Sequence, residues 1–373
     1  MTVMHIEKIV VRHMNMTMKQ PFTTSFGSVQ QKRFLIVEVY DEQGNIGYGE
    51  GEAFEAPWYT EETTETCAHI IETFLAPLIL QGPLHHPNEV TERFRAVRRN
   101  NMAKAAVECA IWDVYCKRMK QPLWKELGGS REKIAVGVSI GLQPTKEALY
   151  AKIDAALQAG YSRIKVKIKR GYDVELVASI REKYPTVPLM VDANSAYTLE
   201  DLPILKKLDA YDLLMIEQPL GADDIINHAK LQSELSTPIC LDESIHSYED
   251  VLTAIQLKSC RVMNVKQARV GGLTEARRIH DICVKEGIQI WCGGMLESGI
   301  GRAHAVALTS LAGFTLPGDT AGSVNYWHED LIQPLVVVEE GFVHMQQEPG
   351  IGYHVDRDIL EKYTESKKTI VHE

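Results

Sequence analysis

The stretch RIKVKIKR, from Arg163 to Arg170, alternates apolar and basic residues along most of its length. This period of two predicts a β-strand with one apolar face and one face that carries Lys165, Lys167 and Lys169. Rows of lysines are common on solvated edge strands, where they discourage unwanted pairing. The role of these lysines therefore depends on where the strand lies in the fold. The neighbouring sequence indicates that position.

From about residue 134 onward, strand-like apolar runs alternate with helical stretches, a pattern typical of a parallel sheet. The runs are KIAVGVSIGL, RIKVKIK, PLMVDAN, LLMIEQP, PICLDES, RVMNVKQ, IQIWCGG and FTLPGD. Ser247 stands where a helix N-cap belongs, and Gly287 stands where a helix ends. Eight strands suit a closed TIM-like barrel, in which the last helix is missing or displaced.

Polar residues recur at a nearly constant step along this series of strands. Asp192 follows Lys167 by 25 residues, Glu217 and Asp242 follow at the same step, and Lys266 comes 24 residues later. One strand–helix–loop unit has about this length, so the five residues occupy equivalent places on successive strands. The apolar residue directly before each of them points to the opposite side of its strand and would face the helices. The five polar side chains would then face the barrel interior, at the mouth where such barrels have their active sites.

Three inward carboxylates on adjacent strands need a compensating cation. Two like charges about 4 Å apart repel by about 4 kcal/mol at an effective dielectric constant of about 20. A divalent metal would relieve this repulsion, and all-oxygen ligation selects Mg²⁺ or Mn²⁺ over zinc. The alternative is a set of interior salt bridges between the acids and Lys167 and Lys266. Placement of the acids on the three middle strands, with a lysine on each flank, favours the metal site.

This arrangement indicates proton abstraction next to a carboxylate. The metal would hold the substrate carboxylate, and a flanking lysine would remove the proton from the adjacent carbon to give an enediolate. Such a lysine must be partly neutral near pH 7. By like-charge repulsion, Lys165 would lower the pKa of Lys167, and Arg269 would lower the pKa of Lys266. Lys169, nearer the end of the strand, would reach solvent.

Five strand-end motifs resemble those of the enolase superfamily, in its muconate-lactonizing subgroup. They are K-V-K at 165–167, V-D-A-N at 191–194, I-E-Q-P at 216–219, L-D-E-S at 241–244 and N-V-K at 264–266. The segments PFTTSFG (21–27), ARVGG (268–272) and CGGMLESGIGRA (292–303) are similar to those of o-succinylbenzoate synthases and N-succinylamino acid racemases. The resemblance runs over nearly the whole chain.

The resemblance implies an α/β fold with two domains. A modified TIM barrel, (β/α)7β, would span residues 131–324. An N-terminal α+β capping domain would span residues 1–130 and would be completed by the C-terminal tail, about 325–373. Cap loops close the barrel mouth in this family, and here that role would fall to residues 20–31 and to the segment around 51–60.

The resemblance also implies the site. Asp192, Glu217 and Asp242 would bind Mg²⁺, for which Mn²⁺ can substitute, and Lys167 and Lys266 would be catalytic on opposite faces of the substrate. Other residues are expected to contact the substrate or to tune a pKa: Lys165, Asn194, Ser139, Arg269, Gly293, Met295, Glu297, Phe22 and Phe26.

The implied activity is that of an o-succinylbenzoate synthase, which dehydrates 2-succinyl-6-hydroxy-2,4-cyclohexadiene-1-carboxylate for menaquinone biosynthesis. The alternative is N-succinylamino acid racemisation by proton transfer between the two lysines, alone or as a second activity. Muconate cycloisomerase shares both lysines and remains an alternative. Dipeptide epimerase is less favoured, since those enzymes carry a D-x-D motif after the eighth strand and this chain has GDTA at 318–321. A catalytically inactive barrel that only binds a ligand is disfavoured by the intact lysines and acids.

Composition excludes several other classes of protein. The chain is 45% hydrophobic and 24% charged, as in globular proteins, and its net charge of −10 argues against nucleic acid as a partner. We see neither a signal peptide nor a run of membrane-span length. Seven cysteines without a C-x-x-C pair predict buried reduced thiols. We therefore expect a cytoplasmic enzyme for a small-molecule carboxylate, without a membrane partner, that self-associates as family members commonly do.

Overall fold

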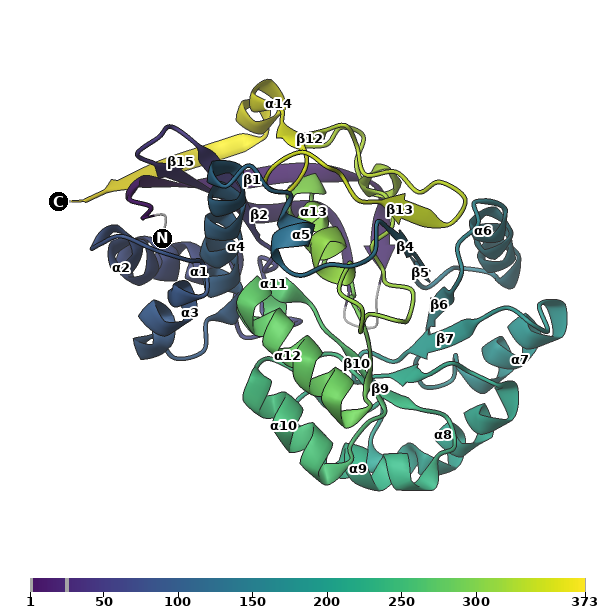
Figure 1. Ribbon diagram of the computed structural model, residues 1–373. Helices are drawn as coiled ribbons and strands as arrows, with labels where there is room; N and C mark the ends of the chain where they lie inside the picture. The colour runs from purple at the N-terminus through teal and green to yellow at the C-terminus, as the bar shows by residue number, and fades with distance from the viewer. Residues whose placement is uncertain (1–2, 24–26, 373) are drawn as a thin grey trace.

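The computed structural model describes residues 3–23 and 27–372, so the expected cap residue Phe26 lies outside the described part. Towards the N-terminus, three antiparallel strands form a meander: β1 (Ile6–Thr23), β2 (Ser28–Asp41) and β3 (Ile46–Gly51). Helices α1 (Thr64–Ile70), α2 (Ala76–Leu80), α3 (Glu89–Arg93), α4 (Asn101–Arg118) and α5 (Leu123–Glu126) follow. A π-helical turn, Ile71–Leu75, joins α1 to α2. Figure 1 shows this cap in purple and blue above the green barrel.

Helix α4 packs directly on the cap sheet because two glycines of β3 let the backbones approach. A Cβ atom on Gly47 would lie 2.1 Å from the carbonyl oxygen of Ala110, and one on Gly49 would lie 2.0 Å from that of Ala106. Such distances are far inside van der Waals contact, so only glycine fits at these two positions. The helix thereby seals the face of the meander that would otherwise expose apolar surface.

A strand from the far end of the chain completes the cap sheet. β15 (Thr364–Val371) pairs antiparallel with β1, which gives the sheet order β15-β1-β2-β3. The two strands lie side by side in Figure 1, in yellow and purple. Short elements precede β15 in this tail: β12 (Ile332–Gln333), β13 (Phe342–His344), β14 (His354–Val355) and α14 (Arg357–Lys362). β12 pairs with β14, and β13 pairs with β4 (Lys133–Ala135) beside the barrel.

Seven parallel strands form the barrel sheet, in the order in which they occur in the chain. They are β5 (Val138–Ile140), β6 (Ile164–Lys167), β7 (Leu189–Asp192), β8 (Ile216–Glu217), β9 (Ile239–Leu241), β10 (Val262–Asn264) and β11 (Gln289–Trp291). The helices between and after them are α6 (Lys146–Gln158), α7 (Val174–Lys183), α8 (Leu202–Leu208), α9 (Ile225–Glu234), α10 (Tyr248–Leu257), α11 (Gln267–Val270), α12 (Leu273–Glu286) and α13 (Gly299–Thr309). The predicted α/β fold, a modified TIM barrel with an N-terminal capping domain, is confirmed.

The eighth apolar run, FTLPGD at 314–319, does not form a regular strand. It closes the ring through single contacts on both sides. Gly318 bridges to Val136, and its carbonyl accepts from Gly137 N–H at 2.8 Å. Asp319 N–H donates to the carbonyl of Cys292 at 2.8 Å. Pro317 interrupts this run and has no backbone donor, which limits regular pairing there.

Side-chain parity along the strands agrees with the prediction. Below the mouth, a small apolar cluster fills the barrel interior: Met190, Met215, Cys240, Val262 and Trp291. Residues that point to the other side of these strands belong to the large core shared with the helices: Val191, Ile216, Leu241 and Val265. Ser247 caps α10 by accepting from Asp250 N–H, and Gly287 ends α12 with φ +72°, as expected.

Two predictions from composition can be compared with the structure. All seven cysteines are buried and free, as the absence of C-x-x-C pairs predicted. Among the described residues, no helix combines the length and apolar character needed to cross a bilayer.

Candidate active site

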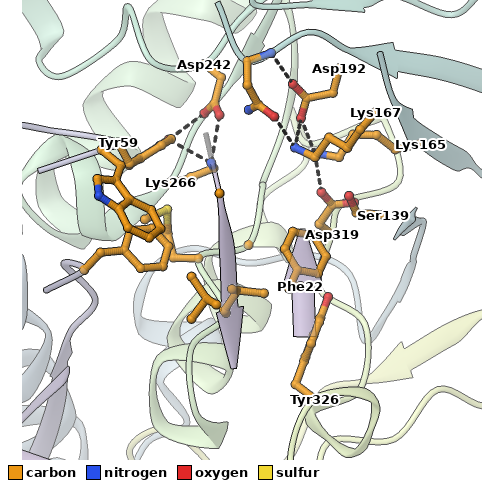
Figure 2. Close-up of a pocket in the computed structure, with 18 residues that line it drawn as sticks. Phe22, Tyr59, Ser139, Lys165, Lys167, Asp192, Asp242, Lys266, Asp319 and Tyr326 are labelled. Atoms are coloured by element: carbon orange, nitrogen blue, oxygen red, sulfur yellow. Dashed lines mark hydrogen bonds and ion pairs between the residues drawn. The ribbon is translucent and has the colours of Figure 1, made fainter. Parts of the chain in front are cut away.

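Lys165 and Lys167 of β6 point into the barrel mouth (Figure 2), and each has a different environment. Lys167 Nζ lies 2.6 Å from Asp192 Oδ2 and 2.7 Å from Asn194 Oδ1. Lys165, one pleat deeper, lies 2.7 Å from Asp319 Oδ2 and stands over the Trp291 ring. Lys169 is exposed, as predicted. The first two lysines are therefore interior counter-ions of the acids, and only the third is solvated.

The other flank of the site is built around Lys266, just after β10. Its Nζ donates to Asp242 Oδ2 at 2.9 Å and to the Tyr59 hydroxyl at 2.8 Å. The same hydroxyl donates to Asp242 Oδ1 at 3.0 Å. Arg269 donates to Asp242 and also to the Tyr59 oxygen. Tyr59 comes from the cap, so the cap supplies a direct partner for this lysine.

The predicted lowering of lysine pKa values is wrong for Lys266. Burial pulls the pKa of Lys266 down and Arg269 repels it as expected, but Asp242 and Tyr59 outweigh both effects and leave the pKa above its ordinary value. For Lys165, burial also lowers the pKa, and Asp319 with the neighbouring acids more than reverses this. The prediction from sequence considered only the repulsion between like charges. It left out the acids whose attraction raises the pKa of these lysines.

Burial raises the pKa of each acid of the site, and the neighbouring charges decide the direction of the net shift. Burial raises the pKa of Glu217 to about 8, with help from Asp192. Burial likewise raises the pKa of Glu243 to about 7. Burial acts in the same sense on Asp242, but Lys266 and Arg269 hold the pKa of that carboxyl below its usual range. Repulsion between Asp192 and Glu217 therefore remains only partly compensated by the lysines.

Five buried cationic side chains face five buried acids in this region. They are Arg163, Lys165, Lys167, Lys266 and Arg269 on one side, and Asp192, Glu217, Asp242, Glu243 and Asp319 on the other. The set is neutral when every member is ionised. A doubly charged cation would then give the site a surplus of positive charge. A substrate with two carboxylates would balance this surplus.

The donor set fits a hard divalent cation. Asp192 and Glu217 end neighbouring strands in direct register, and Asp242 directly follows the next strand. All three are at most 2% exposed and offer only oxygen donors, which Mg²⁺ and Mn²⁺ prefer. Glu243 Oε2, beside them in sequence, is buried without a hydrogen-bond partner. Among the described residues, no three acid, histidine or cysteine side chains already stand together as ligands. Each of the three carboxylates bonds a lysine instead.

The loop after β11 forms one wall of the site. A Cβ on Gly293 would lie 2.4 Å from Lys266 Cε, so the glycine gives this lysine its space. Gly293 N–H donates to Asn264 Oδ1 at 2.7 Å, and Asn264 donates to Glu217 Oε1 at 2.8 Å. Glu297 accepts from Met295 N–H at 2.6 Å and holds the loop in shape.

A single cavity collects most of the predicted residues. Those that line it are Phe22, Ser139, Lys165, Lys167, Asp192, Asn194, Asp242, Lys266 and Met295. Glu217, Arg269, Gly293 and Glu297 stand behind this lining and reach it through the contacts above. Phe22, Ser139 and Asp319 lie on one side in Figure 2, and Tyr59 with Lys266 lies on the other.

Sequence reasoning missed several lining residues. They are Trp58, Tyr59, Leu296, Asp319 and Tyr326. Asp319 is the last residue of the eighth apolar run, so its place in the series of strands was a usable signal. Tyr59 falls in the cap segment expected to close the mouth, but the direction of its hydroxyl depends on how the cap sits on the barrel. No periodic pattern encodes that placement.

Known proteins match this chain over nearly its whole length. Residues 6–128 match the N-terminal domain of mandelate racemase and muconate lactonizing enzyme, and residues 148–359 match the enolase C-terminal domain-like family. An o-succinylbenzoate synthase of Geobacillus stearothermophilus is 56% identical over 98% of this chain and 97% of its own length. An N-succinylamino acid racemase of Thermus thermophilus is 42% identical over 97% and 98% of the two chains.

Solved structures agree with these relatives. A member of the enolase superfamily from Listeria innocua superposes with a TM-score of 0.96 at 44% identity, covering 99% of both chains. A second member, from Enterococcus faecalis, gives a TM-score of 0.93 at 44% identity, covering 99% of this chain and all of the other. With both domains matched and this level of identity, the chain belongs to the mandelate racemase and muconate lactonizing enzyme family of the enolase superfamily.

Proposed function

We propose that this chain is an o-succinylbenzoate synthase, a lyase that removes water from 2-succinyl-6-hydroxy-2,4-cyclohexadiene-1-carboxylate in menaquinone biosynthesis. The observation that carries the proposal is the pair Lys167 and Lys266, which line one buried cavity from opposite flanks with acids between them. Relatives with 49–56% identity carry the same name. Such a pair can address both faces of the planar enediolate that forms when the carbon next to the substrate carboxylate loses its proton.

Mg²⁺ is the metal that we propose for the site. Synthases of this superfamily depend on a metal, and Asp192, Glu217 and Asp242 would hold it here. When bound, Mg²⁺ supplies positive charge that stabilises the enediolate. The substrate carries two carboxylates, which would meet the positive charge of the divalent ion and of protonated Lys266.

The side chains of this chain perform the proton transfers. Lys167 in its neutral form takes the proton from the carbon next to the substrate carboxylate and becomes an ammonium group. It then gives this proton to the departing hydroxyl, which leaves as water, so that Lys167 returns to its neutral form. Lys266 stays protonated on the opposite face and stabilises the negative charge. Phe22, Met295 and Leu296 supply apolar walls that exclude water from this cavity.

N-succinylamino acid racemisation is the second candidate, and the two-sided lysine pair favours it as well. Each lysine would act as the base for one enantiomer and as the acid for the other. Two relatives named as N-succinylamino acid racemases are 42% and 39% identical to this chain. The same site therefore supports a racemase as a second activity.

The test is turnover of the cyclohexadiene carboxylate with Mg²⁺, followed by ultraviolet absorbance. We expect kcat/KM above about 10⁴ M⁻¹s⁻¹, within the range of enzymes on their own substrates, and loss of turnover after chelation. Lys167→Ala and Lys266→Ala should fold normally and lose turnover. Lys169→Ala is the matched control, because this exposed lysine lies near the end of the same lysine row. Wild-type turnover in either of the first two variants would contradict the assigned roles.

A further inference from the structure

Lys32 of strand β2 is a cap residue that the proton transfers do not use, although it is only 1% exposed. Its Nζ donates to the carbonyl oxygens of Met295 at 2.8 Å and of Leu296 at 3.0 Å. Burying an ammonium group costs several kcal/mol unless it is well paired. A lysine in such a place therefore has a defined partner, and the partner here is the loop that follows β11.

Buried acids surround the same ammonium group. Glu50, Glu52 and Glu297 act on Lys32 by charge, and burial raises the pKa of Glu52 well above its ordinary value. Glu50 also accepts from Ser298 N–H and from its hydroxyl at the start of α13. Strands β2 and β3 of the cap thus hold the loop from two directions. Lys32 provides donors and Glu50 provides acceptors.

The loop held in this way has a strained backbone and a direct part in the cavity. Leu296 has φ +60°, in the left-handed region, which costs a residue with a side chain roughly 1–2 kcal/mol. Its carbonyl is one of the two that Lys32 binds. Met295 and Leu296 line the cavity, and Gly293 of the same loop contacts Lys266. The conformation of the loop therefore shapes the space that the substrate occupies.

We propose that Lys32 is a positioning residue that holds the Met295–Leu296 wall of the substrate cavity in its strained conformation. Without the ammonium group, both carbonyls lose a buried donor and Leu296 is free to leave the left-handed region. The lysines and acids of the reaction keep their own contacts, so substrate binding suffers more than the chemical step. This inference rests on the proposed function, because KM is measured with the substrate of that reaction.

Two variants distinguish the effect of Lys32 on the position of the loop from its effect on the charge of the neighbouring acids. Lys32→Met removes the ammonium group but leaves the neighbouring acids without their cation, which threatens folding. Lys32→Met/Glu52→Gln also removes the carboxyl group of one neighbouring acid, so that the cation and one of its acids are lost together. Arg33→Met is the matched control, since Arg33 lies next on the strand with a side chain 49% exposed. We expect the double variant to melt within a few degrees of the wild type.

In the double variant we expect KM to rise about tenfold, a difference of about 1.4 kcal/mol, and kcat to stay within about threefold. Amide hydrogen exchange of residues 292–298, read by mass spectrometry without substrate, should become at least about tenfold faster. The Arg33→Met control should leave KM, kcat and the exchange rate of this segment unchanged. A folded double variant with the wild-type KM or wild-type exchange in this segment would overturn the inference. If the wild type itself shows no turnover, the proposed function fails, and the exchange measurement still decides the role of Lys32.

Discussion

Replacing Gly293 with alanine would test how closely the reaction depends on the position of Lys266. The new Cβ would lie 2.4 Å from Lys266 Cε, 2.5 Å from Asn264 Nδ2 and 2.6 Å from Asn264 Oδ1. Ordinary van der Waals contact begins near 3.4 Å, so the neighbours must move by about 1 Å. Asn264 is fixed by Glu217 and by the Gly293 amide, so Lys266 takes most of the displacement.

A displacement of about 1 Å at a catalytic group costs about 100-fold in rate, or about 2.7 kcal/mol in the barrier. The expected phenotype of Gly293→Ala is therefore a loss of about 100-fold in kcat with a smaller change in KM. Overpacking also destabilises the fold by about 1–3 kcal/mol, so thermal unfolding must show that the variant is folded at the assay temperature.

The assay is dehydration of the cyclohexadiene carboxylate with Mg²⁺, run beside Gly221→Ala. Gly221 also lies in a barrel loop, where a Cβ meets nothing within 4 Å and no positive φ requires glycine. This control should keep kcat within about twofold. The reasoning is refuted if folded Gly293→Ala keeps kcat within about threefold of the wild type, because Lys266 would then not need the position that the glycine allows.

Two further predictions concern the metal site and the stability of the barrel. Asn264→Ala removes the hydrogen bond to Glu217 and should weaken Mg²⁺ binding about 10–100-fold by calorimetric titration; an unchanged affinity would exclude Asn264 from a supporting role. Burial lowers the pKa of His228 to about 4, while its ring accepts from Leu220 N–H and bonds the carbonyl of Asp224. The unfolded chain protonates this histidine first, so stability falls from about pH 6.5 towards pH 4, by about 2 kcal/mol at pH 5. Urea unfolding at pH 7.5 and pH 5 should show His228→Gln losing this part of the pH dependence, and an equal slope in both proteins would contradict it.

The sequence predicted the ladder of strands because each unit repeats with nearly the same length. Alternation along each strand then placed Asp192, Glu217 and Lys266 on one side without any knowledge of the cap. The packing of Met190 below Asp192, inside the barrel, shows that parity carries this information. The irregular eighth run was expected to be a strand, and Pro317 explains why it is not.

The prediction about the pKa of Lys266 failed because this pKa depends on three-dimensional neighbours. Tyr59 approaches Lys266 from a part of the chain that no period connects to β10. Asp319 belongs to the eighth apolar run, but its contact with Lys165 depends on how the barrel closes. Arg269 was expected to act on Lys266, and it also binds Asp242. Self-association and the cellular compartment stay predictions.

Because β1 pairs with β15, the cap sheet cannot be completed until the far end of the chain has been synthesised. β1 is made first, yet one of its two neighbours is made only after the whole barrel. Closing so long a loop costs entropy and slows folding, so the barrel has time to form before the cap sheet is complete. Until then β1 presents an open edge over Lys8–Met14, the stretch that β15 later covers, and another chain can add a strand there. Truncation before Thr364 would make that exposure permanent and turn the cap into a template for aggregation.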